Sequence, residues 1–258
     1  MSLPIHFEVS GSGDIPLVCV HGWGCRGDQF NELSQRLSKD FRIFRVDLPG
    51  HGRTPLGDFL PGFTAYADCL VEFLRLHGLE RAVLCGHSIG GVLSLMAAAS
   101  GRIRPAAVIN LDGSLPATEE TLTGQRKIRR WLDEPDFRKL LARLLARVFF
   151  LPSERDARCE AILRTMCSAP PPVLRFLPEQ VDDLRPEQIL PHVASPVLFV
   201  GSSSARFDAE KAAALLPRIR LGHIPNAGHF LHVYAADQVA ALLKKFVAAE
   251  VNPKKFAH

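Results

Sequence analysis

Apolar runs alternate with amphipathic segments through the first part of the chain, residues 1–113. Each apolar run is short enough to form one buried strand, and residues 28–37 and 68–76 place apolar side chains at helical spacing. Short strands that alternate with helices predict a parallel sheet covered by helices on both faces. The predicted strands are residues 16–20, 41–46, 82–85 and 106–111.

The same alternation returns near the C-terminal end of the chain. The predicted elements there are strands at 196–200 and 219–224 and helices at 209–216 and 236–249. We therefore predict an α/β fold with a mostly parallel, doubly wound sheet, whose core consists of residues 1–113 and 191–258. In such sheets, sites form at the edge where the parallel strands end.

The intervening segment, residues 114–190, contains no convincing strand, and we predict that it forms a helical cap over that edge. Its predicted helices are residues 119–132, 136–150, 154–167 and 172–177. On the second helix, Phe137, Leu141 and Leu144 share one face, and arginines occupy the other. We expect this apolar face to line the substrate site, and packing inside the cap is the alternative.

Composition and charge narrow the possible classes of protein. The chain has 258 residues, of which 47% are hydrophobic and 22% charged, as in an ordinary globular protein. A net charge of +4 is too small and too dispersed to indicate nucleic-acid binding. No apolar run is long enough for stable membrane insertion, and the N-terminus lacks the apolar stretch of a secretory signal.

The six cysteines include no C-x-x-C pair. This pattern is typical of reduced thiols in a cytoplasmic protein, and not of a disulfide framework or a zinc site. We expect neither a metal nor an organic cofactor, a small molecule as the binding partner, and a monomer or homodimer.

Residues 86–90, GHSIG, form a G-x-S-x-G motif between the predicted strand at 82–85 and a helical run. A serine on such a tight strand-to-helix turn is exposed at the edge of the sheet, where the following helix directs backbone N–H groups toward developing negative charge. We therefore identify Ser88 as a candidate nucleophile.

A serine nucleophile needs a base, and His229 is the best placed of the ten histidines. It lies in a loop after the last predicted strand and before the last helix, a loop that returns to the same edge as Ser88. His87 adjoins Ser88 but points in another direction, so we assign it with Trp23 and Phe230 to substrate binding.

Two carboxylates are candidates for the acid that orients His229. Asp112 follows the predicted strand at 106–111, which is expected beside the strand that carries Ser88. Asp208 follows the strand at 196–200 at a greater distance and suits the N-cap of the next helix. We favour Asp112 and keep Asp208 as the alternative.

An oxyanion hole requires two N–H donors at the same edge. The backbone N–H of Ile89 directly follows the candidate nucleophile. The glycine-rich loop after the first predicted strand supplies the N–H of Trp23 as the second donor. The Trp23 side chain is also expected to form a wall of the substrate pocket.

Together these residues resemble the α/β-hydrolase superfamily, and the resemblance covers nearly the whole chain. The four matching motifs are HGWG at 21–24, DLPGHGRT at 47–54, GHSIGG at 86–91 and NAGHF at 226–230. The chain departs from the common pattern at Ser204, where the family usually has the acidic residue. A subgroup of small acyl esterases and thioesterases places the acid after the earlier strand, which implies Asp112 as the acid and Ser204 as an assisting group near His229.

The resemblance implies hydrolysis of carboxylic esters or thioesters with a small or medium apolar acyl group, through an acyl-enzyme on Ser88. Cofactor-free ring-cleaving dioxygenases share the fold and are the alternative, to which Asp112 and Trp23 conform but Ile89 does not. Carbon–carbon hydrolase and lactonase activities stay open. A non-catalytic binder is disfavoured by the intact serine–histidine pair.

Overall fold

One seven-stranded sheet forms the centre of the molecule in the order β1-β3-β2-β4-β5-β6-β7. The computed structural model describes residues 4–204, 206–252 and 256. All neighbouring strands pair in parallel except β1, which is antiparallel to β3 at one edge. The strands are β1 His6–Ser10, β2 Ile15–Val20, β3 Phe41–Asp47, β4 Val83–His87, β5 Ala107–Leu111, β6 Val197–Gly201 and β7 Ile219–His223.

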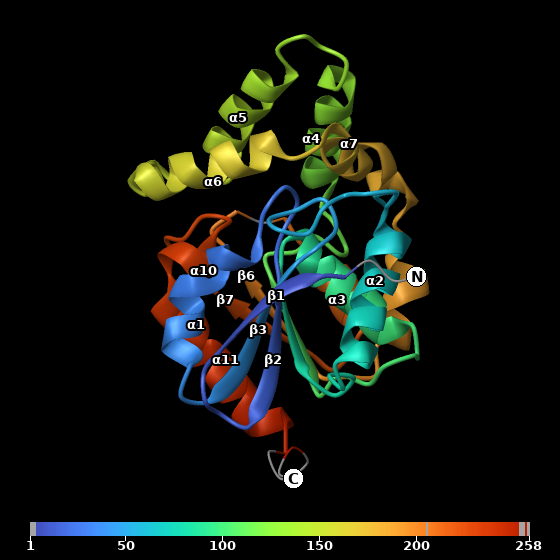
Figure 1. Cartoon of the computed structure of the whole chain (residues 1–258), viewed down its shortest axis with the longest axis vertical. Helices are drawn as coiled ribbons and strands as arrows, with labels where there is room; N and C mark the ends of the chain where they lie inside the picture. The colour runs from blue at the N-terminus through green and yellow to red at the C-terminus, as the bar shows by residue number, and fades with distance from the viewer. Residues whose placement is uncertain (1–3, 205, 253–255, 257–258) are drawn as a thin grey trace.

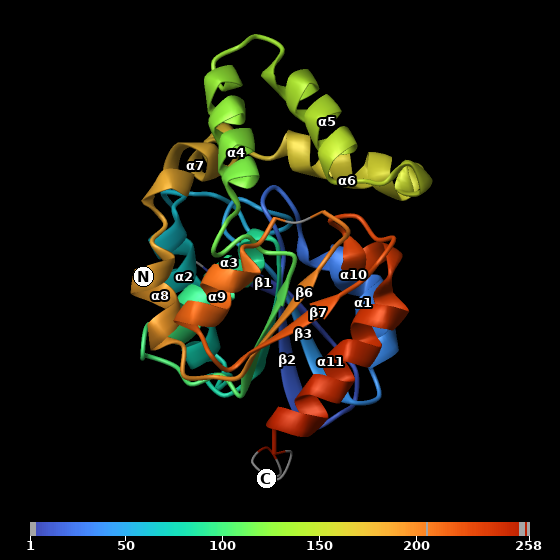
Figure 2. The ribbon, with the colours of Figure 1, turned by 180° about the vertical axis from the view of Figure 1, so that it is seen from behind.

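Helices cover both faces of this sheet. Figures 1 and 2 show α1 and α11 on one face and α2 and α3 on the other. The central strands β4, β5 and β6 are fully buried between these layers, as their apolar sequences predict. The predicted α/β fold with a mostly parallel, doubly wound sheet is therefore confirmed. The helices of this part are α1 Asn31–Leu37, α2 Phe63–Leu76, α3 Ile89–Ala99, α9 Ala209–Leu215, α10 Leu231–Tyr234 and α11 Ala236–Glu250.

The chain between β5 and β6 forms a group of helices at one end of the sheet (Figure 1). Its helix α6 begins later than predicted, because Asp156 accepts hydrogen bonds from the backbone N–H groups of Arg158 and Cys159 and so caps the first turn. The helices of this group are α4 Glu119–Trp131, α5 Phe137–Val148, α6 Ala157–Ser168 and α7 Pro171–Gln180. The next helix, α8 Pro186–Ile189, lies beside the sheet layer, where it contacts α3 and α9 (Figure 2). Short 3₁₀ helices cover Gly27–Phe30, Pro152–Glu154, Val181–Asp183 and Leu190–His192.

The register of the parallel strands places the candidate site at the edge below α4 to α7. His87 pairs with Leu111, and Leu111 pairs with Val200, so β4, β5 and β6 end side by side. Ser88, Asp112 and the turn after Gly201 therefore lie next to one another at the C-terminal edge of the sheet.

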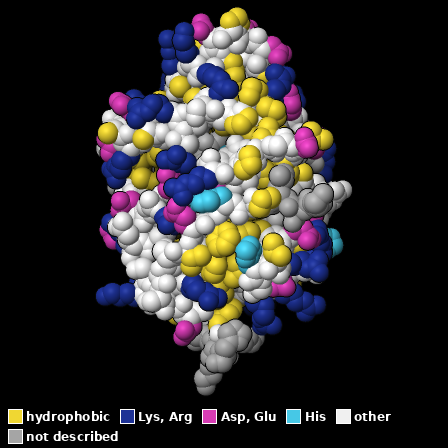
Figure 3. Space-filling model, in the orientation of Figure 1, with side chains coloured by type: hydrophobic (Ala, Val, Ile, Leu, Met, Phe, Trp, Pro, Cys, Tyr) yellow, Lys and Arg dark blue, Asp and Glu magenta, His cyan; other side chains and the backbone are white. Residues whose placement is uncertain are grey.

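The surface seen in Figure 3 carries basic, acidic and apolar side chains intermingled over the helical cap and the sheet layer alike. Within the described part of the chain, no helix has the length and apolar character needed to cross a membrane.

Candidate active site

Ser88 occupies a strained turn between β4 and α3. Its φ of 53° and ψ of −122° are unusual for a residue with a side chain, and its N–H donates to the carbonyl of Leu111 at 2.8 Å. The flanking glycines allow this turn, since a Cβ on Gly86 would lie 2.1 Å from the carbonyl oxygen of Gly90. The turn leaves Ser88 half-buried at the floor of a cavity.

His229 lies opposite, in the loop between β7 and α10, and its partner is Asp112. Nδ1 of His229 donates to Oδ2 of Asp112 at 2.7 Å, and both side chains are almost completely buried. A histidine that donates through Nδ1 keeps its Nε2 free to accept a proton. The pair therefore has the geometry of a base oriented by a carboxylate.

Asp112 is itself held by the turn after β6. The backbone N–H of Ser202 donates to Oδ1, and the Ser202 hydroxyl donates to Oδ2, each at 2.9 Å. Asp112 adopts a φ of 55°, which is unfavourable for a residue with a side chain. The hydrogen bonds to its carboxylate help to hold it in this conformation. Sequence reasoning missed Ser202, although its place at the end of the strand beside β5 could have indicated it.

The two other polar candidates near this turn lie elsewhere. Ser204 donates from its backbone N–H to the Ser202 hydroxyl at 3.3 Å, and in the described residues its side chain makes no hydrogen bond with His229. The serine hydroxyl that supports the pair is that of Ser202, two residues earlier, and it contacts Asp112. Asp208 accepts from the N–H of Lys211 at 2.9 Å and caps α9, as its alternative reading predicted.

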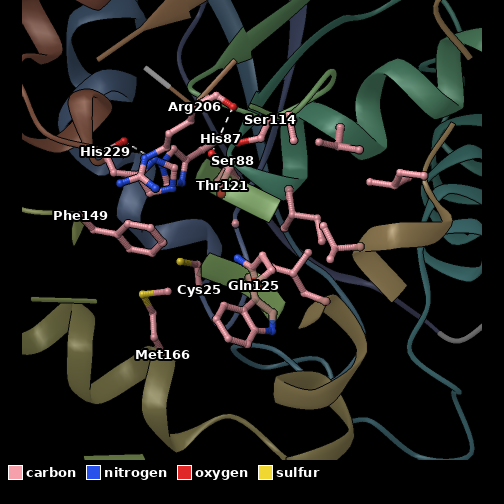
Figure 4. A pocket seen from close by; sticks show the side chains of 18 of the residues that line it. Cys25, His87, Ser88, Ser114, Thr121, Gln125, Phe149, Met166, Arg206 and His229 are labelled. Carbon is pink, nitrogen blue, oxygen red and sulfur yellow. Dashed lines mark hydrogen bonds between the residues drawn. The ribbon is translucent and has the colours of Figure 1, made fainter. Parts of the chain in front are cut away.

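Ser88 and His229 face the same cavity, as Figure 4 shows. Among the described residues, the Ser88 hydroxyl makes no hydrogen bond, with Nε2 of His229 or with any other group. Catalytic hydrogen bonds are often long without substrate and shorten in the complex.

Two backbone N–H groups adjoin Ser88 at the same cavity. Ile89 is the first residue of α3, where helical N–H groups have no carbonyl partner within the helix. Trp23 follows β2, and its indole Nε1–H donates to the Val173 carbonyl at 2.7 Å, which fixes the ring as a wall. Within the described chain, neither backbone N–H has a hydrogen-bond partner, so both are free to bind an oxyanion.

The cavity has a volume of about 60 Å³ and a mostly apolar lining. Three of the predicted substrate contacts, Trp23, His87 and Phe230, line it. Cap residues that sequence reasoning did not identify complete the wall, and several are labelled in Figure 4. They are Thr121, Gln125, Phe149, Met166, Leu177, Val181 and Leu184.

Phe137, Leu141 and Leu144 do not line this cavity, so the structure does not place them beside Ser88 as predicted. Phe137 and Leu141 belong to the hydrophobic cluster inside the protein, and Leu144 packs partly buried against it. Helix α5 packs its apolar face against α6, which leaves that face no access to the cavity.

Buried charges and rings set the basicity of His229. Burial lowers the pKa of His229, the hydrogen bond and charge of Asp112 raise it, and the charge of Arg206 lowers it further. The Arg206 side chain is 11% exposed, with Nε 3.7 Å from Oδ2 of Asp112. Sequence reasoning did not identify this arginine, which belongs to the same loop as Ser202.

The His87 side chain packs against His229 and holds the backbone of the loop that carries it. Its Nε2–H donates to the backbone carbonyl of His229 at 3.0 Å, and its ring centroid is 4.6 Å from that of His229. Burial, followed by the nearby charges of His232 and His229, holds the pKa of His87 well below its usual value. His87 therefore stays neutral and holds the loop of the candidate base.

The loop that carries His229 is also anchored to the cap. The N–H of His229 donates to the Phe149 carbonyl, and the N–H of Gly228 donates to Oε1 of Glu154, both at 2.8 Å. Glu154 is buried and accepts a further hydrogen bond from the N–H of Leu151. Residues 149–154 of the cap thus fix the backbone at Gly228 and His229.

In the described part of the chain, no group of three or more His, Cys, Asp or Glu side chains is placed to hold a metal ion.

Known proteins resemble this chain over nearly its whole length. The Alpha/beta hydrolase family matches residues 17–242. A pimeloyl-[acyl-carrier protein] methyl ester esterase of Stenotrophomonas maltophilia (strain K279a) is 31% identical over 270 residues, covering 95% of this chain and 97% of that protein. A protein of the same name from Xanthomonas oryzae pv. oryzae (strain MAFF 311018) is 29% identical, covering 95% of this chain and 99% of that protein.

Solved structures show the same fold. A thermophilic esterase from Thermogutta terrifontis has a TM-score of 0.79 at 24% identity and covers 96% of this chain and 94% of its own. The enol-lactonase from Burkholderia xenovorans LB400 has a TM-score of 0.81 at 18% identity and covers 95% of this chain and 96% of its own. At these identities the likeness concerns the fold alone.

Proposed function

The chain belongs to the alpha/beta hydrolase family, and from that membership we propose that it is a serine hydrolase that cleaves carboxylic ester bonds. The observation that carries the proposal is the 2.7 Å hydrogen bond between His229 and Asp112 beside Ser88 on its strained turn. This arrangement supports nucleophilic catalysis, since the serine and its base line one apolar cavity and the buried acid orients the base.

The reaction begins when Nε2 of His229 takes the proton of the Ser88 hydroxyl. Oγ then attacks the ester carbonyl carbon, and the N–H groups of Ile89 and Trp23 bind the resulting oxyanion. His229 returns the proton to the departing alcohol oxygen as the carbon–oxygen bond breaks, which leaves an acyl-enzyme. A water molecule, deprotonated by His229, attacks this intermediate and releases the carboxylic acid with Ser88 restored.

The apolar wall supports an acyl group of small or medium length as the substrate. Phe63 of α2 and Val92 of α3 line the cavity, together with apolar side chains of the cap such as Leu184. The names of the relatives make a methyl ester the first alcohol to test. We place the enzyme in the cytoplasm, and its six free cysteines are consistent with a reducing compartment.

The proposal is tested with p-nitrophenyl esters of increasing acyl length and with methyl esters of the same acids. We expect hydrolysis by the natural chain, and loss of nearly all activity in Ser88→Ala. A fluorophosphonate probe should label the natural chain at Ser88 but not this variant.

An inactive protein that resists the probe would contradict the proposal. Oxygen consumption with a hydroxyquinolone, in place of ester hydrolysis, would instead favour the dioxygenase alternative.

A further inference from the structure

A second, larger hollow adjoins the cavity of Ser88. It runs between α4 and α5 and has a volume of about 590 Å³, against about 60 Å³ for the cavity itself. Four residues line both spaces, namely Thr121, Gln125, Phe149 and Arg206. These four residues form a wall that the two spaces share, and we call the second hollow the α4–α5 groove.

The shared wall contains a buried acceptor that lacks a hydrogen bond in the described chain, Oε1 of Gln125. Nε of Arg206 also makes no hydrogen bond, but it lies 3.7 Å from Oδ2 of Asp112, which balances its charge. Buried polar groups in proteins are nearly always satisfied, and an unsatisfied acceptor at a cavity wall suits a ligand that supplies a donor. The wall thus presents one acceptor to a group that passes between the cavity and the groove.

The groove opens on the side of His229. The Phe149 ring centroid lies 4.3 Å from that of His229, and the Arg206 guanidinium lies 4.7 Å from the Phe149 ring centroid. Figure 4 shows His229, Phe149 and Arg206 grouped on the same side of the pocket. Since His229 must protonate the departing oxygen, the alcohol part of an ester lies on this side and the acyl part on the other.

The lining of the groove is mixed and carries an excess of positive charge. Lys127, Arg147 and Arg206 line it with one acidic residue, Glu120. Lys127 and Arg147 are exposed, and among the described residues neither forms a salt bridge, although the Lys127 ammonium lies 5.2 Å from the Trp131 ring centroid. Apolar side chains such as Ile128, Leu144 and Leu145 form the rest of the wall.

We infer that the α4–α5 groove is a subsite for the alcohol part of the substrate, and that it accepts an extended alcohol ending in a negative charge. This inference rests on the proposed ester hydrolysis. It adds a class of substrate, because a methyl ester leaves the groove empty.

Three butyrate esters test the inference with one acyl group: ethyl butyrate, hexyl butyrate and the butyrate ester of 6-hydroxyhexanoate. The hexyl chain adds length, and the hydroxyhexanoate adds a terminal carboxylate. We expect kcat/KM to rise about tenfold from the ethyl to the hexyl ester, as a buried aliphatic chain contributes binding energy. The terminal carboxylate should raise kcat/KM further. Added salt should reduce the gain from the carboxylate but not the gain from the longer chain.

Gly124→Trp tests the groove directly. An added Cβ at Gly124 meets no atom within 4 Å, so the indole can occupy the groove that Gly124 lines without displacing the backbone. We expect the ratio of hexyl to ethyl kcat/KM to fall about tenfold. Gly124→Ala is the matched control for loss of the glycine. Arg130→Trp places the same ring on an exposed part of α4 outside the groove. Both controls should keep the ratio of hexyl to ethyl kcat/KM found in the natural chain.

Charge reversal tests the anionic end. Lys127→Glu combined with Arg147→Glu should abolish the preference for the hydroxyhexanoate ester over the hexyl ester. Unchanged ratios in Gly124→Trp, or no preference for longer or anionic alcohols in the natural chain, would overturn the inference. Failure to hydrolyse even ethyl butyrate and the p-nitrophenyl esters would instead remove the proposed function.

Discussion

At the scale of single residues, the supporting acid is the point on which sequence and structure can be compared most sharply. The Asp112 carboxylate contacts His229 and Ser202, whereas the Asp208 carboxylate caps the start of α9. Asp112 was preferred from strand order alone, because strands that neighbour in a parallel sheet end at one edge. The contribution of Ser202 depends on side-chain rotamers in the turn, which periodicity does not describe.

Replacement of the two aspartates separates their roles. Asp112→Asn keeps the shape but removes the charge that orients His229, so kcat for ester hydrolysis should fall by about 10⁴-fold. Asp208→Asn should change kcat little, because asparagine also caps helices well. Steady-state kinetics of both variants with one p-nitrophenyl ester make the comparison, and the reverse order of effects would contradict our assignment.

Ser202→Ala removes one of the hydrogen bonds to the Asp112 carboxylate and leaves the one from the backbone N–H. A hydrogen bond to a charged group contributes about 1.5–3 kcal/mol, so we expect kcat to fall by about ten- to a hundredfold. Ser204→Ala is the matched control on the same turn, and its kcat should stay near that of the natural chain. Equal effects of the two substitutions would refute the role given to Ser202.

At the scale of elements, periodicity predicted most helices and strands but not what each of them contacts. The strand β1 was not predicted, because it is short, only partly buried and depends on antiparallel pairing with β3. The apolar face of α5 was recognised, yet its neighbour proved to be α6 and not the cavity. The polar cap residues Thr121 and Gln125, which line the cavity, have no pattern that distinguishes them from solvent-exposed helix positions.

The link between the cap and the loop of His229 gives a prediction at this scale. Glu154→Ala leaves the buried N–H groups of Gly228 and Leu151 without their acceptor, at a cost of about 1–3 kcal/mol each. We expect a lower melting temperature and a lower kcat, since the backbone of His229 loses an anchor. Glu154→Gln retains one acceptor and should be intermediate.

Glu160→Ala is the control for loss of a cap carboxylate, because its side chain is 73% exposed and exposed ion pairs contribute little. If Glu154→Ala lowers the melting temperature but leaves kcat of the folded protein unchanged, the segment stabilises the cap without positioning His229.

At the scale of the whole molecule, five buried histidines make stability depend on pH. Burial is the largest cause that lowers the pKa of His21, His51, His87, His229 and His232, and the pKa of His232 falls to about 3. Each is neutral in the folded protein at pH values where the unfolded chain binds a proton. The unfolded state therefore gains stability as the pH falls below about 6.5.

We expect the free energy of unfolding to decrease between pH 7 and pH 5, by up to about 1.4 kcal/mol per pH unit for each such histidine. His232 is the most suitable to replace, because its ring packs 4.6 Å from that of Phe30 and, in the described chain, neither ring nitrogen has a partner. His232→Phe should flatten the pH dependence. Urea denaturation at several pH values measures it, and a slope equal to that of the natural chain would contradict this account.

The anchoring of the His229 loop by residues 149–154 has a consequence for engineering. Exchange of the cap would affect the candidate base, because cap residues accept hydrogen bonds from the loop that carries His229. A transplanted cap would need to supply its own acceptors for the N–H groups of Gly228 and His229. A chimera that keeps residues 149–154 should retain its kcat. A chimera that replaces these residues should still bind substrate, but its kcat should fall because His229 is no longer positioned to activate Ser88.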